Sequence, residues 1–547
     1  MLSKPKKVTF LLIFSLLVYC LLFTCLNIGL VKANRASIYI KADGSVEGTD
    51  NIQRTGNLYR FTGNLANSIV IEKDNIILDG MGYTLQGDGS KEGIILQERN
   101  NVTIKNVHVT NFSPCIYINN SSDNKITGNT LTYTLEFSPP WILQIKNFSN
   151  NNLISENTIQ QELQIDWLTG NAVDIRKSLY TVIVDNNITT NNMGCIGLDN
   201  YANHTTISGN TITSTTTGGA VNFWGTNTTF SNNTLIGCTL HIYRSSQNSV
   251  ADNLVDGKPL VYLDAVTDQL IDDNEAGQII LANCRNITAE NIDLSHIATG
   301  GIQLLWTNSS KVSNYTGSLY LEGSFNNSIV GCNCVEIELY TSSSNTITGT
   351  TVTNSEGLDY SCGITFHSSD YNIITENTIT QNRYSGINLW RSNYNNIAYN
   401  QITYNAEGIG LQQSSNNTIH RNNIAYNHNS GIFMEGSGYS TIFENNFVDN
   451  SRQVTGWDST NIFDNGSTGN YWSDYNATDA NNDNIADSPY PITINSHFTV
   501  DSITDYDNFP LMKPTVIPEF PTWIILPLSL MATLFVAILK KQAFNPN

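Results

Sequence analysis

Residues 361–450 read SCGITFHSSDYNIITENTITQNRY, SGINLWRSNYNNIAYNQITYNAE, GIGLQQSSNNTIHRNNIAYNHNS and GIFMEGSGYSTIFENNFVDN when they are divided into four lines. A Gly-Ile pair returns at a step of 22 or 23 residues, and other positions keep the same step. These positions are held by Gly363, Gly386, Gly408 and Gly431; by Ile374, Ile397, Ile419 and Ile442; by Asn377, Asn400, Asn422 and Asn445; and by Asn382, Asn405, Asn427 and Asn450. A fixed period of this length predicts a solenoid, in which each repeat stacks on the next.

Each repeat is predicted to hold three short strands and no helix. Apolar residues alternate with variable ones after the Gly-Ile pair, as in Ile364-x-Phe366 and Ile387-x-Leu389, and this is the period of a strand. Two more short apolar runs follow in each repeat, separated by Asn, Gly and Ser, which favour turns. The Leu-x-x-Leu-x-Leu signature of a leucine-rich repeat is missing. The pattern therefore predicts an all-β fold, a parallel β-helix.

The recurring asparagines have two interpretations. Stacked Asn side chains can hydrogen-bond along a stack, as they do in cross-β assemblies. Asn is also a common turn residue and needs no ladder to explain its frequency. The shared register at equivalent positions favours the ladder.

The composition limits the partners that the protein can have. The formal net charge is −20 and only 14% of the residues are charged. Such a chain lacks the basic surface that nucleic acids require, so no nucleic-acid partner is expected. It would also repel acidic polysaccharides unless a cation or a local arginine cluster intervened. The cysteines at 115, 195, 238, 284, 332, 334 and 362 are scattered, which favours buried thiols over a metal or redox motif.

The two ends of the chain carry apolar segments. Lysines precede a long apolar run in residues 1–33, which we interpret as a signal peptide or an N-terminal anchor. The run Trp523–Leu539, followed by Lys540 and Lys541, predicts a transmembrane helix with a short cytoplasmic tail within residues 516–547. The sequence thus predicts an exported protein, held at the cell surface by its C-terminal helix with the β-helix outside. Its many Asn-x-Ser/Thr sequons predict a glycoprotein, although a chain this rich in Asn, Ser and Thr also forms sequons by chance.

Between these ends, three regions are predicted. Residues 34–92 form an N-terminal cap and the first coils, residues 93–470 the β-helix repeats, and residues 471–515 a C-terminal cap with an Asp/Asn-rich loop. The stretch GKPLVYLDAVTDQLIDDNEAGQIIL, which begins at Gly257, interrupts the repeats and is interpreted as a longer loop or a lateral hairpin.

The chain resembles the NosD-like right-handed β-helix proteins, also grouped as carbohydrate-binding and sugar-hydrolysis repeat domains. The resemblance rests on the Asn-x-Ile coils of 361–450, on LDGMGYTLQG at 78–87, on GQIILANCRNITAENIDLS at 277–295 and on GNYWSDYNATDANNDNIADSPYPI at 469–492. IPEFPTW followed by a span and lysines is similar to the Pro-Glu-Phe C-terminal sorting signals of archaeal surface proteins. The resemblance implies a right-handed, pectate-lyase-like solenoid.

Two sets of residues are candidates for glycan binding. The residues between the apolar positions of each first strand point outward and would form stacked rows, with Thr365, Asn388, Gly410 and Phe433 in one row and His367, Trp390, Gln412 and Glu435 in the next. Tyr404 and Tyr426 repeat at one turn and would extend this surface. Aromatic rings beside hydrogen-bonding groups suit sugars, whose C–H faces pack on rings. Ordinary solvent exposure is the alternative for any one of these residues.

A calcium site is a second candidate. Asp479, Asn481, Asp483 and Asp487 have the spacing of oxygen ligands in a calcium loop, although no Glu stands at the last ligand position. A solvated loop closed by Asx turns is the alternative.

The most probable role on sequence grounds is a structural or glycan-binding surface protein. The sequence contains no recognised catalytic motif, because the only adjacent acidic pair, Asp272-Asp273, is typical of a turn. Two alternatives stay open: a polysaccharide lyase or hydrolase whose acidic residues meet only in the fold, and a copper accessory protein like NosD. The copper role is disfavoured because the eight histidines are scattered and there is no Met-rich run.

Overall fold

The computed structural model describes residues 37–135, 141–162, 170–191, 194–215, 219–272, 275–297, 300–353, 362–494 and 503–517. This part of the chain consists of strands and turns and contains no helix. The strands stack side by side in parallel ladders, and each turn of the chain contributes one strand to each of three sheets. The predicted parallel β-helix is therefore confirmed.

One winding shows how the sequence produces this fold. In residues 385–406 the chain forms β43 (Ser385–Trp390), β44 (Asn396–Ala398) and β45 (Gln401–Thr403), which belong to the first, second and third sheets. Ile387, Leu389, Ile397 and Ile402 point inward and are fully buried. Each lies in register with an apolar residue of the next winding, so the interior is a continuous column of aliphatic side chains.

The asparagine ladder is present. The side chain of Asn377 donates to Oδ1 of Asn400 at 2.9 Å, and Asn400 donates to Asn422 at the same distance. The ladder continues through Asn445 to Asn470, again at 2.9 Å. An equivalent ladder in the first half of the chain joins Asn129, Asn157, Asn186, Asn210, Asn233 and Asn253. These side chains are buried, so the ladder satisfies amide groups that water does not reach.

The first stack of windings, which we call the N-terminal arm, ends at β29 (Leu254–Val255). Its second sheet runs from β4 (Leu58–Phe61) to β28 (Ser249–Ala251), and its third from β5 (Leu65–Ala66) to β29. Its first sheet contains β1 (Ile38–Ile40), β6 (Ile69–Ile71), β9 (Ile94–Gln97), β12 (Ile116–Asn119), β15 (Leu143–Lys146), β18 (Asn171–Arg176), β21 (Gly194–Leu198), β24 (Gly219–Phe223) and β27 (Cys238–Ile242).

A tight hairpin at Asp256 and Gly257 ends this arm. Both residues have positive φ, 50° and 80°, and β30 (Lys258–Asp264) then pairs antiparallel with β29. Asp-Gly with two positive φ values is the favoured two-residue hairpin turn, and it reverses the chain direction. The stretch predicted to be a loop or a lateral hairpin thus begins with a hairpin, and its strands start a second stack within the range 93–470.

We call this second stack the C-terminal arm. Its second sheet runs from β31 (Leu270–Ile271) to β53 (Thr460–Ile462), and its third ends at β54 (Tyr471–Trp472). Its first sheet contains β30, β32 (Gln278–Ala282), β34 (Ile302–Leu305), the end of β35 (Lys311–Glu322), β37 (Asn333–Tyr340), β40 (Ile364–His367), β43, β46 (Glu407–Gln412), β49 (Ser430–Glu435) and β52 (Val454–Trp457).

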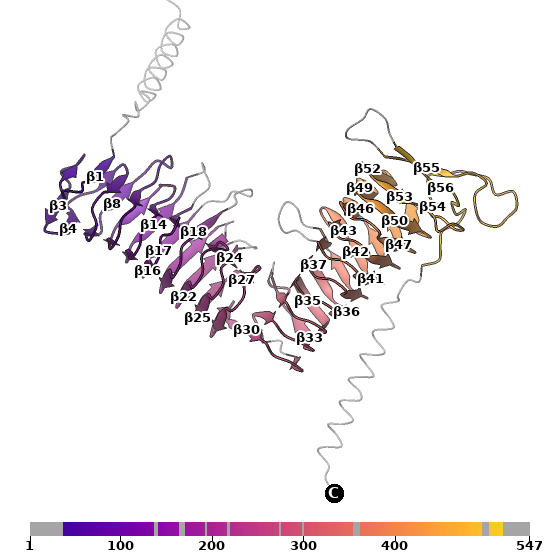
Figure 1. The fold of residues 1–547 in the computed structure, drawn as a ribbon, viewed down its shortest axis with the longest axis horizontal. Coiled ribbons are helices and arrows are strands. Elements are labelled where there is room, and N and C mark those ends of the chain that lie inside the picture. Colours follow the sequence, from indigo (N-terminus) through magenta and orange to yellow (C-terminus); the bar gives the residue numbers. More distant parts are fainter. Residues whose placement is uncertain are drawn as a thin grey trace, which may run out of the picture.

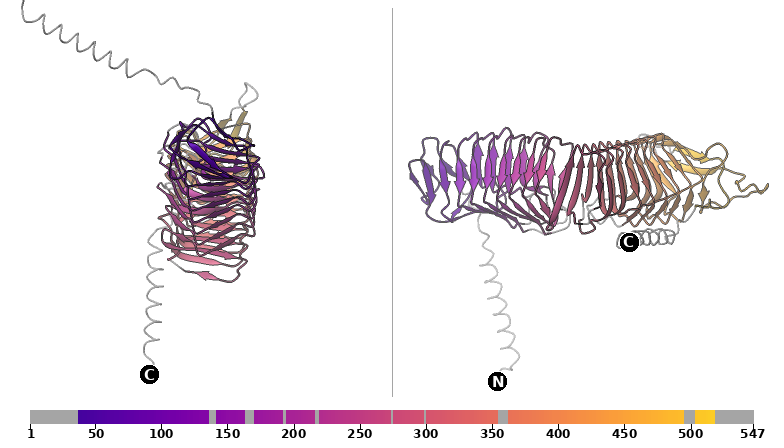
Figure 2. Two further views of the ribbon diagram at one scale, coloured as in Figure 1. Left: turned by 90° about the vertical axis from the view of Figure 1, so that its left-hand side faces the viewer. Right: turned by 90° about the horizontal axis from the view of Figure 1, so that it is seen from below.

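The two arms form a V with β30 near its vertex (Figure 1). The first sheets of both arms, represented by β24 and β27 and by β43, β46 and β49, line the inside of the V, whereas β25 and β41 lie on the outside. Seen from below, the two arms follow one another in a single row (Figure 2). The concave face is therefore built from first-sheet strands.

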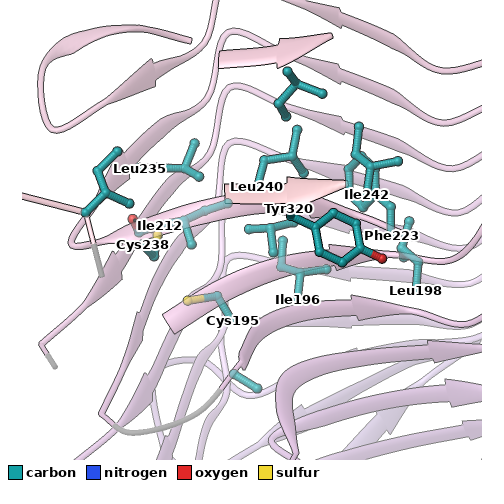
Figure 3. Close-up of a cluster of buried hydrophobic side chains, with 14 of the residues drawn as sticks. Cys195, Ile196, Leu198, Ile212, Phe223, Leu235, Cys238, Leu240, Ile242 and Tyr320 are labelled. Carbon is teal, nitrogen blue, oxygen red and sulfur yellow. Dashed lines mark hydrogen bonds between the residues drawn. The ribbon is translucent and has the colours of Figure 1, made fainter. Parts of the chain in front are cut away.

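The side of the C-terminal arm closes the open end of the N-terminal arm. Tyr320 of β35 lies beside Phe223, Leu240 and Ile242 in the core of the N-terminal arm (Figure 3), and it is only 6% exposed. Backbone groups of β27, which has no further strand on this side, bond to the side chains of Gln278 and Gln303. Both glutamines are fully buried.

Short antiparallel pairs cap the outer ends. At the N-terminal end, β3 (Ile52–Thr55) pairs with β4. At the C-terminal end, β55 (Tyr490–Ile494) pairs with β56 (Ile503–Asp507), and Trp472 stacks between Phe447 and Tyr490 at 4.3 Å from each ring. Asp507 is buried and accepts the backbone N–H of Asn470, so it ends the asparagine ladder.

Two further sequence predictions concern the apolar segments at the ends of the chain and the state of the cysteines. Within the described ranges no helix is long and apolar enough to cross a membrane. The predicted apolar helices, in residues 1–33 and from 518 onward, lie outside those ranges. The cysteines from Cys115 to Cys362 are described, and all seven are buried thiols outside any disulfide, as the sequence predicts.

Candidate functional site on the concave sheet face

The ends of the first-sheet strands in the C-terminal arm carry a row of outward side chains. Strand pairing places these residues side by side, one from each winding. The row, which we call the outer row, consists of Tyr340, His367, Trp390, Gln412, Glu435 and Trp457. Each is partly exposed. The predicted set His367, Trp390, Gln412 and Glu435 is thus brought together in the expected order, and it extends further in both directions.

Aromatic contacts link the members of the outer row. The His367 ring stacks on Tyr340 with centroids 5.0 Å apart and meets Trp390 edge-on at 5.5 Å. The guanidinium of Arg391 lies 4.4 Å from the Trp390 ring centroid, so it covers part of that ring. Burial lowers the pKa of His367, and the ring is therefore neutral at pH 7 and can both donate and accept a hydrogen bond.

The neighbouring outward row, Thr365, Asn388, Gly410 and Phe433, is also in register. Phe433 meets Trp457 edge-on at 5.0 Å, so the two rows join at this end of the arm. At Gly410 an added Cβ would lie 2.8 Å from Oδ1 of Asn388, so a larger residue there would displace the Asn388 amide. Rings at both ends and amides between them give this face a mixed aromatic and polar character.

At the vertex of the V, the outer row continues onto the N-terminal arm. Arg244 lies 4.8 Å from the ring centroid of Tyr340, and the adjacent Tyr243 stacks on Trp224 at 4.9 Å. Tyr243 also meets Tyr320 edge-on at 5.5 Å. A line of rings therefore crosses from one arm to the other along the concave face.

Three carboxyl groups lie in this vertex region. Glu322 is buried and accepts the backbone N–H of Arg244 at 2.8 Å and the hydroxyl of Tyr320 at 2.9 Å. Burial raises the pKa of Glu322 and of Glu338. Burial and the neighbouring Glu338 raise the pKa of Glu336 to about 7. These carboxyls were not predicted, because only the fold brings Glu322 at the end of β35 beside Glu336 and Glu338 of β37.

Tyr404 and Tyr426 lie at a different edge of the first sheet. They stack with centroids 5.3 Å apart, and they are 49% and 43% exposed. Each tyrosine follows a third-sheet strand, β45 or β48 (Asn423–Ala425), and precedes the first-sheet strand that comes next, β46 or β49. The outer row lies at the other end of those first-sheet strands. The two tyrosines thus form an exposed pair, separated from the outer row by the width of the sheet.

The predicted calcium residues lie together in the C-terminal cap, where they bond to their own loop. Asp479 accepts the backbone N–H groups of Asp483 and Asn484 at 3.2 and 3.0 Å. Asp487 accepts the N–H of Ala480, and Asn481 donates to Asp483. The loop also contains two Asx turns, in which Asn481 accepts the N–H of Asp483 at 3.1 Å and Asp483 accepts the N–H of Ile485 at 2.9 Å. Among the residues of known position, no group of three or more His, Cys, Asp or Glu is arranged to hold a metal ion.

Two family models match the sequence. Residues 285–477 match the family described as "Periplasmic copper-binding protein (NosD)". Residues 92–255 match the family described as "Right handed beta helix region". The first match falls mainly in the C-terminal arm and the second in the N-terminal arm, so each covers part of one arm. No curated protein matches the sequence.

Several solved structures align with most of the chain, at low sequence identity and low TM-score. The periplasmic alginate epimerase AlgG is 14% identical, with 77% of this chain and 76% of that one covered and a TM-score of 0.22. The A-module of the mannuronan C-5 epimerase AlgE4 of Azotobacter vinelandii is 13% identical, with 73% and 88% covered and a TM-score of 0.21. The PL6 family alginate lyase AlyGC is 10% identical, with 75% and 91% covered and a TM-score of 0.19. The family matches and the stacked windings together identify the chain as a right-handed parallel β-helix repeat protein.

Proposed function

We propose that the protein binds a glycan along the concave face of its C-terminal arm. The observation that carries this proposal is the outer row, in which Tyr340, His367, Trp390 and Trp457 stand in register with the polar side chains of Gln412 and Glu435. Sugar rings offer C–H faces to aromatic side chains and hydroxyls to amides and carboxylates. The row supplies both kinds of group along one line.

The spacing of the row suits an extended polysaccharide. Neighbouring parallel strands lie about 4.8 Å apart, so the row advances by about this distance per winding. One sugar ring of an extended chain has a similar length. A polysaccharide lying parallel to the arm would therefore meet one residue of the outer row with each sugar. This arrangement accounts for a row that is repeated over several windings.

Charge favours a neutral glycan. The protein carries a net charge of −20, and the vertex end of the row holds Glu336 and Glu338. The negative charge of the protein would repel a uronate polymer. Arg244 and Arg391 lie near the row and would offset part of this repulsion. A neutral glycan avoids this electrostatic repulsion.

The location that we propose is the outer surface of the cell. The sequence supports export through the lysines and apolar run of residues 1–33, and anchoring through Trp523–Leu539 followed by two lysines. Fractionation of cells that express the full chain tests this location. We expect the protein to be recovered with the membranes, and we expect protease added to intact cells to cleave the β-helix. Recovery of the protein in the cytosol would contradict the proposed location.

A glycan array probed with the full-length protein tests the binding. We expect neutral polysaccharides to be bound, and we expect Trp390→Ala to lose about 1–2 kcal/mol of binding free energy, or roughly tenfold in affinity. Tyr439→Ala is the matched control, because Tyr439 is 76% exposed on β50 (Gly438–Phe443) of the second sheet. Equal binding by both variants would contradict the proposal.

Cleavage of the bound glycan is the second candidate function. Its support is the raised pKa of Glu336, about 7, beside a second carboxyl at the end of an aromatic row. A carboxyl that is protonated near neutral pH suits a general acid, and glycosidases pair such a group with a second carboxylate. Release of reducing sugar from array-positive polysaccharides, abolished by Glu336→Gln, is the expected result for an enzyme. Binding without any release would exclude this second function.

A further inference from the structure

We infer that a hollow beside Tyr404 is a separate subsite that takes a single terminal sugar of the bound glycan. The hollow, which we call the corner pocket, has a volume of about 380 Å³. It is lined by Gln381, Asn382, Arg383, Tyr404, Ala406 and His428. This inference rests on the proposed glycan binding, and it adds a place on the protein that the outer row does not include.

A buried acceptor without a partner lines the corner pocket. Asn382 heads an asparagine ladder and donates to Oδ1 of Asn405 at 2.9 Å. In the next rungs, Oδ1 of Asn405, Asn427 and Asn450 each accepts from the asparagine before it. Asn382 is 3% exposed, and its own Oδ1 has no hydrogen-bond partner among the residues that the structure describes. An unsatisfied buried acceptor is unfavourable, and a small turn of the Asn382 amide toward the pocket would let a ligand O–H bond to it.

The walls of the pocket suit the rest of a sugar. Tyr404 stacks on Tyr426 with an interplanar angle of 15°, and the pair presents an exposed aromatic surface. His428 is exposed at the rim and adds a ring that can donate or accept. A pocket of this volume lies at the small end of ligand sites, which fits one sugar ring rather than an extended chain. A side-chain amide, an aromatic ring and an imidazole around one small hollow suit a single hexose.

The position of the pocket explains why the ligand would be a branch or chain end. Glu407 begins β46 directly after Ala406, and Gln412 of the outer row ends the same strand. The corner pocket and the outer row therefore stand at opposite ends of the same strands. A polysaccharide that lies along the outer row can reach the corner pocket only with a substituent that crosses the sheet.

Titration of the full-length protein with single sugars tests the inference. The probes are glucose, galactose, mannose and N-acetylglucosamine, with binding followed by saturation-transfer NMR on the sugar. Two variants change the pocket without touching the ladder: Tyr404→Ala removes the ring, and Ala406→Leu fills the space. We expect at least one sugar to bind, and both variants to weaken that binding about tenfold or more.

Tyr371→Ala is the matched control. Tyr371 stacks on Tyr394 at 5.0 Å and is 58% exposed, but it does not line the pocket. We expect this variant to bind the single sugar as the wild type does. Binding that survives Tyr404→Ala and Ala406→Leu would overturn the inference, as would failure of every probe to bind. Neither result decides the outer row, because polysaccharide binding and its loss in Trp390→Ala are measured separately.

Discussion

The side chain of Gln278 bonds to both backbone groups of Leu240. Its Oε1 accepts the Leu240 N–H at 3.1 Å, and its Nε2 donates to the Leu240 carbonyl at 2.7 Å. One amide side chain thus makes the two hydrogen bonds that a further strand of the sheet would make with Leu240. The edge of β27 is closed in this way by the side of the second arm, and this contact helps to hold the two arms together.

Gln278→Leu is predicted to weaken the junction between the arms. The substitution keeps the volume but leaves the buried N–H of Leu240 without its partner, which costs about 1–3 kcal/mol, whereas the Leu240 carbonyl keeps the bond from Gln303. Urea unfolding measures the loss, and small-angle X-ray scattering reports whether the arms separate. Gln269→Leu, at an exposed position of the same arm, is the control. Equal stability of the two variants would show that the glutamine bonds do not hold the junction.

Asn400→Leu is predicted to destabilise the ladder. Asn400 accepts from Asn377 and donates to Asn422, and it is fully buried, so its loss leaves amide groups of two windings unpaired. The expected cost is about 1–3 kcal/mol. The exposed Asn429→Leu should change stability by less than about 0.5 kcal/mol. If the two substitutions cost the same, turn propensity alone explains the asparagines.

Glu336→Gln is predicted to change how stability depends on pH. The folded-state pKa of Glu336 is raised from the ordinary 4.5 to about 7, so between these values the folded state binds more protons than the unfolded state. The contribution of Glu336 to stability is therefore full below pH 4.5 and is lost as the pH rises through 7.

The variant should accordingly gain stability relative to the wild type between pH 5 and 8, as thermal unfolding at each pH would show. Glu376→Gln, at an exposed position, is the control substitution. A pH-independent difference for Glu336→Gln would mean that Glu336 ionises normally in the folded protein.

The repeat is readable from the sequence because its causes are local. Ile387 and Leu389 alternate with outward residues, and Asn400 returns at every winding, so strand, core and ladder all follow from residue type and spacing. The register of the strands then fixes the outer row, so the sequence alone predicts that His367 and Trp390 lie side by side. The repeat period thus determines both the core and one surface.

The junction is not readable in the same way. Gln278 and Gln303 occur once each, and on the sequence they look like ordinary residues beside apolar ones. Their role depends on where the second arm points, which the Asp256-Gly257 hairpin determines. That dipeptide is a hairpin signal that the sequence does contain. The vertex carboxyls and the corner pocket depend on contacts between distant segments, and no local pattern encodes those.

Affinity as a function of glycan length tests the central claim most directly. The full-length protein is titrated with neutral oligosaccharides of increasing length, taken from the polysaccharide that binds best on the array. We predict that affinity rises with each added sugar until the outer row is spanned, and that Trp390→Ala flattens this rise while Tyr439→Ala leaves it unchanged. Affinity that is the same for short and long oligosaccharides, or a rise that Trp390→Ala does not alter, would contradict the claim that a glycan lies along the outer row.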